Sequence, residues 1–120
     1  MRFFERLFGR REPVISDPVA AVIGRLSEIC EAAGTKRIEA DFLCYFSTEA
    51  AAAAAAAEAE TAGYATSVGA IDETHSLQAV STMDLEDAIV RRHIAWFEEL
   101  ARRHSGEYDG WGAQPSPARG

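Results

Sequence analysis

The feature that most constrains the fold of this chain is a ten-residue run, Arg37 to Phe46, in which apolar and polar side chains alternate. From Ile38 to Phe46 every second residue is apolar, and the positions between them are charged or tyrosine, with Leu43 as the one break. A period of two residues is that of a β-strand, because successive side chains point to opposite faces of a sheet. The run therefore predicts a strand with one buried face and one face largely in contact with water.

Two predicted helices flank this strand. The first is expected to open at Ser16-Asp17-Pro18 and to end at Gly34, and apolar residues recur between them at steps of three and four. The second is expected to follow Ser47-Thr48-Glu49 and to continue through eight alanines, Ala50 to Ala57, until Gly63. Alanine is the strongest helix former, so this run indicates a packed helix rather than a linker.

A β-hairpin and a third helix are expected next. Tyr64 to Ala70 and His75 to Met83 have the composition and alternation of two paired strands, and Gly69 predicts a bulge in the first of them. Asp84 is expected to cap a helix from about Leu85 to Ser105, which has a broad apolar face opposite a charged one.

The chain then continues GEYDGWG, from Gly106 to Gly112, before an end that contains two prolines. If this stretch is a last strand, the elements that follow the first helix have the order β-α-β-β-α-β. The sequence therefore predicts an α+β fold, a ferredoxin-like β-α-β-β-α-β sandwich preceded by an extra N-terminal helix. The expected units are a basic aromatic tail over residues 1–15, one domain over residues 16–113 and a flexible tail over residues 114–120.

Trp111, which lies between Gly110 and Gly112, has two interpretations. Tryptophan and tyrosine dominate binding hot spots, so one interpretation is an exposed contact for a partner. The other, which we favour, is a terminal strand whose tryptophan closes the core, with glycines that permit close backbone packing or positive φ. Asp109 is expected to orient the local backbone in the manner of an Asx turn.

The charge of the chain favours a basic partner. Its net charge is −7 at pH 7, which argues against direct binding of nucleic acid, because phosphates need clustered lysine and arginine. Residues 1–12 differ, since they are aromatic and carry a net +2, which leaves about −9 for the rest. This segment either contacts a membrane surface or a partner, or it is a frayed tail. No hydrophobic run is long enough to span a membrane, and we expect a cytoplasmic protein.

The sequence contains none of the common catalytic motifs. His75, His93 and His104 lie far apart, and HExxH, GxSxG, P-loop and GxGxxG patterns are missing. Cys30 and Cys44 share no CxxC spacing and have no histidine nearby, so we interpret both as small buried apolar residues. We therefore expect no metal, no cofactor and no enzymatic activity.

The string YDGWG, Tyr108 to Gly112, directly after an amphipathic helix, resembles the end of the ribonuclease E inhibitor B family, the RraB-type regulators. The segment IEADFLCYFSTEAAAA and the helix-to-strand step Ala62-Gly63-Tyr64 extend the resemblance, which covers roughly residues 17 to 113. The resemblance implies a ferredoxin-like fold without catalytic activity. It also implies binding to endoribonuclease E through the basic, non-catalytic C-terminal scaffold region of that enzyme, and hence a role in RNA turnover.

Two classes of function follow. The first is a regulatory module that binds a basic protein segment, and the second is a ferredoxin-like small-molecule sensor or minor enzyme. A homodimer through the edge of the hairpin over residues 64–83 is compatible with both. For the first class, we expect the contact surface to combine the wet face of the first strand with the end of the last one, through Glu39, Asp41, Tyr45, Tyr108, Asp109 and Trp111.

Overall fold

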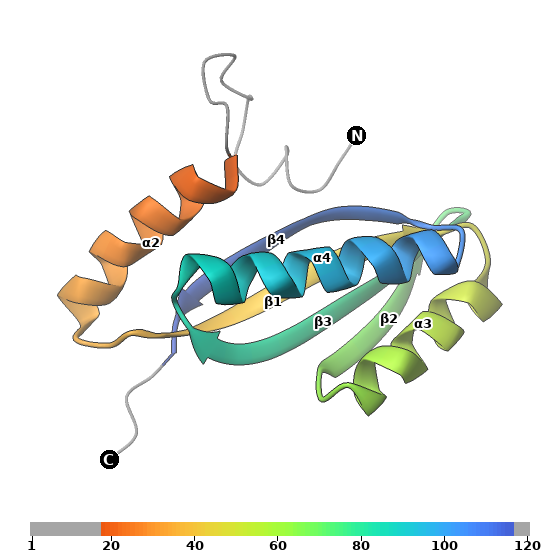
Figure 1. The fold of residues 1–120 in the computed structure, drawn as a ribbon. Helices are drawn as coiled ribbons and strands as arrows, with labels where there is room; N and C mark the ends of the chain where they lie inside the picture. The colour runs from red at the N-terminus through yellow and green to blue at the C-terminus, as the bar shows by residue number, and fades with distance from the viewer. Residues whose placement is uncertain (1–17, 117–120) are drawn as a thin grey trace.

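The computed structural model describes residues 18–116, and within them it has three helices and one four-stranded antiparallel sheet (Figure 1). In chain order the elements are α2 (Pro18–Ala33), β1 (Arg37–Phe46), α3 (Glu49–Thr61), β2 (Ala65–Ile71), β3 (Thr74–Asp84), α4 (Asp87–Arg103) and β4 (Glu107–Pro115). The predicted α+β class and the predicted order of elements are therefore confirmed. The expected tail over residues 1–15 and the capping residues Ser16 and Asp17 lie outside the described residues, as do residues 117–120.

The strands lie in the order β2-β3-β1-β4, so β1 is a central strand with a partner on each side. It pairs antiparallel with β3 along its whole length, from Arg37 opposite Asp84 to Phe46 opposite His75. On its other side it pairs antiparallel with β4, although the two strands are far apart in the sequence. Because β1 has two neighbours, its alternating pattern decides which face of the whole sheet is buried.

One face of the sheet is covered by the helices. The apolar residues of β1 at positions 38, 40, 42, 44 and 46 are at most 2% exposed, and they share one core cluster with residues of α2, α3 and α4. In Figure 1, α4 lies across the strands on this side, and α2 and α3 flank it. The predicted two-faced strand is therefore confirmed.

The alanine-rich segment is a packed helix, as predicted. Thr48 is its N-cap, and its hydroxyl oxygen accepts a hydrogen bond from the backbone N–H of Ala51 at 3.1 Å. Gly63 follows its C-terminal end with a φ of 105°, a conformation that favours glycine. Four alanines are buried against the sheet, because small side chains allow the helix backbone to lie close to the strands: Ala52, Ala55, Ala56 and Ala59.

The predicted cap of the last helix is wrong. Asp84 is the final residue of β3, where its carboxylate forms an ion pair with Arg37 at 3.0 Å. The backbone N–H of Leu85 then donates to the carbonyl of Lys36 at 2.8 Å, which keeps the chain extended beyond the strand. The N-cap of α4 is Glu86, which makes no capping hydrogen bond through its side chain. Pairing with a strand more than forty residues away thus overrides the local capping preference.

The bulge is also in a different place from the prediction. Gly69 lies within regular pairing of β2 with β3 over residues 65–71. The irregularity instead lies in β4, where Gly110 is opposite Leu43 and Tyr108 is opposite Cys44, so that Asp109 is the extra residue. The same strand continues to Pro115, two residues beyond the expected end of the domain, because its pairing with β1 reaches Ile38.

Two glycines offer a matched test of backbone packing. A Cβ atom on Gly106, between α4 and β4, would lie 2.5 Å from the carbonyl oxygen of Tyr45 and meet the buried ring of Phe46. We therefore expect Gly106→Ala to lower the free energy of unfolding by roughly 1–3 kcal/mol. Gly24, within α2, has open space at its Cβ position, so Gly24→Ala should raise the same quantity by about 0.5–1 kcal/mol. Urea unfolding measures both, and equal effects would contradict the packing argument.

Candidate functional site

The face of the sheet opposite the helices is the candidate binding surface, and we call it the open face. Strand pairing places on it the residues that alternate with the buried ones. Its members are Glu39, Asp41, Leu43 and Tyr45 on β1, Gln78, Val80 and Thr82 on β3, and Gly110, Gly112 and Gln114 on β4. None of the three described helices covers this face, so its side chains are exposed or half-buried wherever they are larger than glycine.

Two carboxylates on the open face are held by neutral amides. The side-chain N–H₂ of Gln78 donates to Asp41 at 3.2 Å, and that of Gln114 donates to Glu39 at 3.1 Å. No lysine or arginine among residues 18–116 forms an ion pair with either carboxylate. The two amides therefore orient the carboxylates without neutralising their negative charge.

The pKa of Asp41 reflects this arrangement. Its half-burial raises the pKa of the carboxyl group most, and repulsion from Glu39 adds to the rise, while the hydrogen bond from Gln78 opposes it. A carboxylate next to an unneutralised like charge is stabilised by any cation that approaches. The pair is thus an anionic site that is oriented in advance and lacks a basic partner among the described residues.

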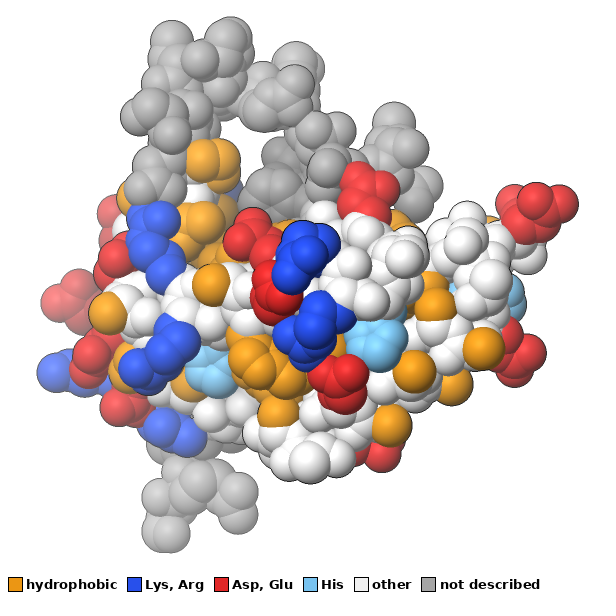
Figure 2. Space-filling view, turned by 45° about the vertical axis from the view of Figure 1, so that its right-hand side comes forward, with side chains coloured by type: hydrophobic (Ala, Val, Ile, Leu, Met, Phe, Trp, Pro, Cys, Tyr) orange, Lys and Arg blue, Asp and Glu red, His pale blue; other side chains and the backbone are white. Residues whose placement is uncertain are grey.

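The charges on the helix side are arranged differently. Figure 2 shows basic and acidic side chains next to one another around α4. Arg91 pairs with Asp87 at 2.9 Å, and Arg102 pairs with Glu99. These charges compensate one another within the chain, whereas no described lysine or arginine pairs with Glu39 or Asp41.

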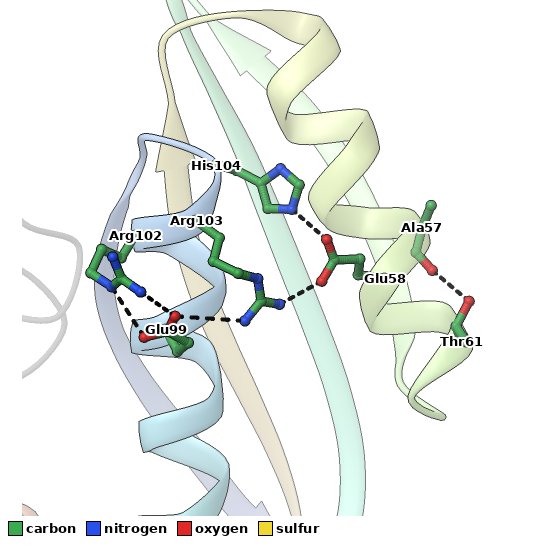
Figure 3. Close-up of polar contacts among 7 residues, drawn as sticks. All are labelled: Ala57, Glu58, Thr61, Glu99, Arg102, Arg103 and His104. Atoms are coloured by element: carbon green, nitrogen blue, oxygen red, sulfur yellow. Dashed lines mark hydrogen bonds and ion pairs between the residues drawn. The ribbon is translucent and has the colours of Figure 1, made fainter.

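The bridge between α3 and α4 shows the same compensation (Figure 3). One carboxylate oxygen of Glu58 accepts from Arg103 at 2.5 Å, and the other lies 2.7 Å from Nε2 of His104. The hydrogen bond from Arg103, and then that from His104, lowers the pKa of Glu58. His104 is the C-cap of α4, and its partner Glu58 is 46 residues away in the sequence.

The glycines near the end of the chain complete the open face. Gly110 lies opposite Leu43 and Gly112 opposite Asp41, so β4 presents backbone rather than side chains beside these residues. Trp111, between them, points to the covered face opposite Phe42 and is only 4% exposed. The alternation Gly-Trp-Gly therefore gives the core a large aromatic and leaves the open face flat.

The structure brings together three of the six expected contact residues. Glu39, Asp41 and Tyr45 share the open face, as expected from their common strand. The other three belong to the covered side or to the bulge: Tyr108, Asp109 and Trp111. The sequence favours a buried Trp111, but it could not reveal the bulge at Asp109, because that shift of register arises from the pairing of two distant strands.

Two of these three residues, Asp109 and Trp111, are buried, whereas Tyr108 is half-buried. Asp109 is 3% exposed, and Trp111 follows its favoured interpretation as a core residue. Burial, followed by the nearby Cys44, raises the pKa of the Tyr108 hydroxyl. The expectation that Asp109 lies at the surface is therefore corrected.

A second polar pair lies inside the aromatic cluster beneath α4. The hydroxyl of Tyr64 is 2.5 Å from Nδ1 of His93, whose ring stacks on Phe42 at a centroid distance of 6.0 Å. Burial, and to a smaller extent Arg92, lowers the pKa of His93 and so favours the neutral ring. The tautomer of that ring decides whether Nδ1 or the Tyr64 hydroxyl donates in their shared hydrogen bond. His93 is thus a half-buried residue of α4.

The two cysteine thiols lie in the core of the protein. Cys30 and Cys44 are both free and buried, as predicted, and burial, followed by repulsion from Asp109, raises the pKa of Cys44 to about 12. Residues 18–116 contain no group of three or more His, Cys, Asp or Glu side chains that could hold a metal ion. No helix within the same residues is both long enough and apolar enough to cross a membrane.

The chain matches a known protein family. The model of the family described as regulator of ribonuclease activity B matches residues 26–113, which is well over half of the chain. The matched region begins within α2 and ends within β4, so it takes in the whole of β1 and nearly all of the open face. No curated protein matched the chain.

The lowered pKa of His93 leads to a pH prediction. The pKa of a histidine in an unfolded chain is about 6.5. Below that pH the unfolded chain takes up a proton that folded His93 does not, so the free energy of unfolding falls as the pH drops from about 6.5 through the lower folded pKa. We expect urea unfolding of His93→Gln to show a smaller loss of stability between pH 7 and 5 than the wild type shows. Between pH 7 and 8 the free energy of unfolding should depend on pH in the same way for both proteins. If it also fell equally steeply for both below about pH 6.5, the lowered pKa of folded His93 would be contradicted.

Proposed function

The chain belongs to the regulator of ribonuclease activity B family, and we propose that it regulates ribonuclease activity by binding endoribonuclease E. The proposed contact is between the open face and a basic segment of the non-catalytic scaffold region of that enzyme. The protein acts without catalysing a reaction, and its proposed location is the cytoplasm. Family membership supports a regulator over the alternative of a small-molecule sensor or minor enzyme.

The observation that carries this proposal is the pair of oriented, unneutralised carboxylates of Glu39 and Asp41. They lie beside the half-buried apolar side chains of Leu43 and Val80 and beside Gly110 and Gly112 of β4, which add no side chains to the face. A basic segment with apolar residues would satisfy both features, because its cations meet the acids while its carbon chains cover the apolar centre.

We also propose that the fold is the ferredoxin-like one with an added N-terminal helix. The chain order β-α-β-β-α-β and the strand order β2-β3-β1-β4 support this assignment, because two βαβ-like units then interleave in one antiparallel sheet. This arrangement places both crossover helices on one face and leaves the other face for binding.

A charge-neutralising double substitution tests the binding surface. Glu39→Gln with Asp41→Asn removes two negative charges and keeps side-chain size, so we expect affinity for the basic scaffold region to fall roughly tenfold, about 1.4 kcal/mol. The matched control is Glu28→Gln with Glu31→Gln, which removes the same charge from the exposed surface of α2. Isothermal titration at two salt concentrations measures both variants.

An equal loss in the α2 control would show that overall charge, rather than the open face, drives binding. No binding by the wild type would reject the proposed partner. The substitutions should also weaken the effect of the protein on ribonuclease activity in the same proportion as the affinity.

A homodimer is the second proposed contact, and it uses the edge strand β2. Within residues 18–116, two of the three exposed large hydrophobic residues lie on this strand, Val68 at 45% and Ile71 at 72% exposure. The strand ATSVGAI has no charge and no proline, the usual protections of an edge. The other edge, β4, has the bulge at Asp109, ends in Pro115 and contacts α2. Two copies of an acidic chain can approach each other along this neutral edge, because no like charges repel there.

We expect the wild type to show a mass near twice 13.0 kDa at rising concentration in sedimentation equilibrium. Val68→Lys should weaken this dimer by more than tenfold, because it places one lysine from each copy on the two paired edge strands, where like charges repel. Ser27→Lys, which adds the same charge on the exposed surface of α2, is the control and should leave the dimer intact. A wild type that stays monomeric, or a Val68→Lys variant that dimerises normally, would reject this contact.

A further inference from the structure

The basic N-terminal segment has no role in the function proposed above. Residues 2–11 hold four of the chain's twelve lysine and arginine residues, in a protein with a net charge of −7. They also hold four of its large apolar side chains: Phe3, Phe4, Leu7 and Phe8. A segment that combines arginine with aromatic residues has the chemistry that the open face requires of its ligand.

We infer that residues 2–11 bind the open face of their own chain and compete there with the basic segment of the partner. The arginines would meet the carboxylates of Glu39 and Asp41, which have neutral amides as their partners. The phenylalanines would cover Leu43 and Val80 next to the backbone of Gly110 and Gly112. The identity of the competitor rests on the proposed function, whereas the contact within the chain does not.

The segment is attached where it can reach the open face. It leads into α2 at Pro18, and α2 packs against β4. Strand β4 is one edge of the sheet and therefore one border of the open face. The 17 residues that precede Pro18 can span up to about 55–60 Å when extended. Four strands about 4.8 Å apart make a face only about 15 Å wide, so every part of it lies within reach.

The covalent attachment makes this occupant the favoured one. A covalent tether of this length holds a ligand at an effective concentration on the order of millimolar, which a second copy or a separate peptide reaches only at high concentration. A weak contact of a few arginines is therefore enough to occupy the face in the free protein. The partner segment must then displace it, so the N-terminal segment lowers the apparent affinity of the protein for its partner.

Paramagnetic relaxation in the full-length chain tests the contact directly. A nitroxide on Gly9→Cys can be attached selectively, because Cys30 and Cys44 are buried and burial raises the pKa of both thiols. We expect broadening of the amides of Asp41, Val80 and Gly112 on the open face, and none at Ala54 on the exposed side of α3.

Two sets of variants complete this test. Arg6→Gln with Arg10→Gln should remove the broadening, and so should Glu39→Gln with Asp41→Asn. The control is the double variant Arg25→Gln with Arg92→Gln, which removes two positive charges from exposed positions on α2 and α4. It should leave the broadening unchanged. Broadening confined to the helix side, or its absence everywhere, would overturn the inference.

A mixed sample separates contact within a chain from contact between chains. Spin-labelled chains without isotope are combined with isotope-labelled chains without a spin label. Broadening in this mixture would mean that the segment binds a second copy, and it would overturn the inference.

The competition is tested with the basic scaffold segment of endoribonuclease E as the probe. Its addition should abolish the broadening, and its affinity for Arg6→Gln with Arg10→Gln should be roughly tenfold higher than for the wild type. If the scaffold segment binds but the broadening persists, the competition is overturned. If it does not bind at all while the broadening is present, the proposed function fails and the contact within the chain stands.

Discussion

The structure depends on the two-sided pairing of β1. Its ten residues bond to β3 on one side and to β4 on the other, so its period of two is imposed on the whole sheet. Phe42 shows the consequence, since it is fully buried, lies opposite Trp111 and stacks on Phe97 of α4 at a centroid distance of 4.7 Å. A shift of one residue would turn Asp41 into this cluster, where an unpaired carboxylate costs several kcal/mol. The same constraint that fixes the core therefore fixes the acids on the opposite face.

The division of charge between the two sides follows from this geometry. The helix side carries arginines within reach of acids of the same or a neighbouring helix, as at Arg91 with Asp87 and Arg103 with Glu58. The open face is built from strands, and there Glu39 and Asp41 accept hydrogen bonds from glutamines of the neighbouring strands, Gln114 on β4 and Gln78 on β3. Cross-strand neighbours interact over short distances, so the choice of glutamine over lysine at these positions keeps the face anionic. A protein that binds a basic partner needs such a face, and an overall negative charge alone would not provide one.

Local patterns in the sequence predicted most of the elements, because their signals are contained within a few residues. The alternation of β1, the alanine run of α3 and the stop at Gly63 all lie where they were expected. The errors concern interactions between distant segments. Asp84 has a good capping side chain, but strand pairing and Arg37 hold it in β3. Within the candidate site, one strand face was predicted from its period, whereas the burial of Asp109 depends on a bulge that only the pairing of β4 with β1 creates.

The proposed dimer and the open face are linked by symmetry. Antiparallel pairing of β2 with its copy would continue the sheet across a two-fold axis perpendicular to it, because adjacent antiparallel strands are related in this way. Both open faces would then lie on the same side of one eight-stranded sheet, each with its own pair of carboxylates. A scaffold with several basic stretches could engage both faces at once, and the second contact would form at a high effective concentration. An edge contact that touches neither Glu39 nor Asp41 would in this way set how tightly the open face holds a long basic partner, and how readily that partner displaces the N-terminal segments.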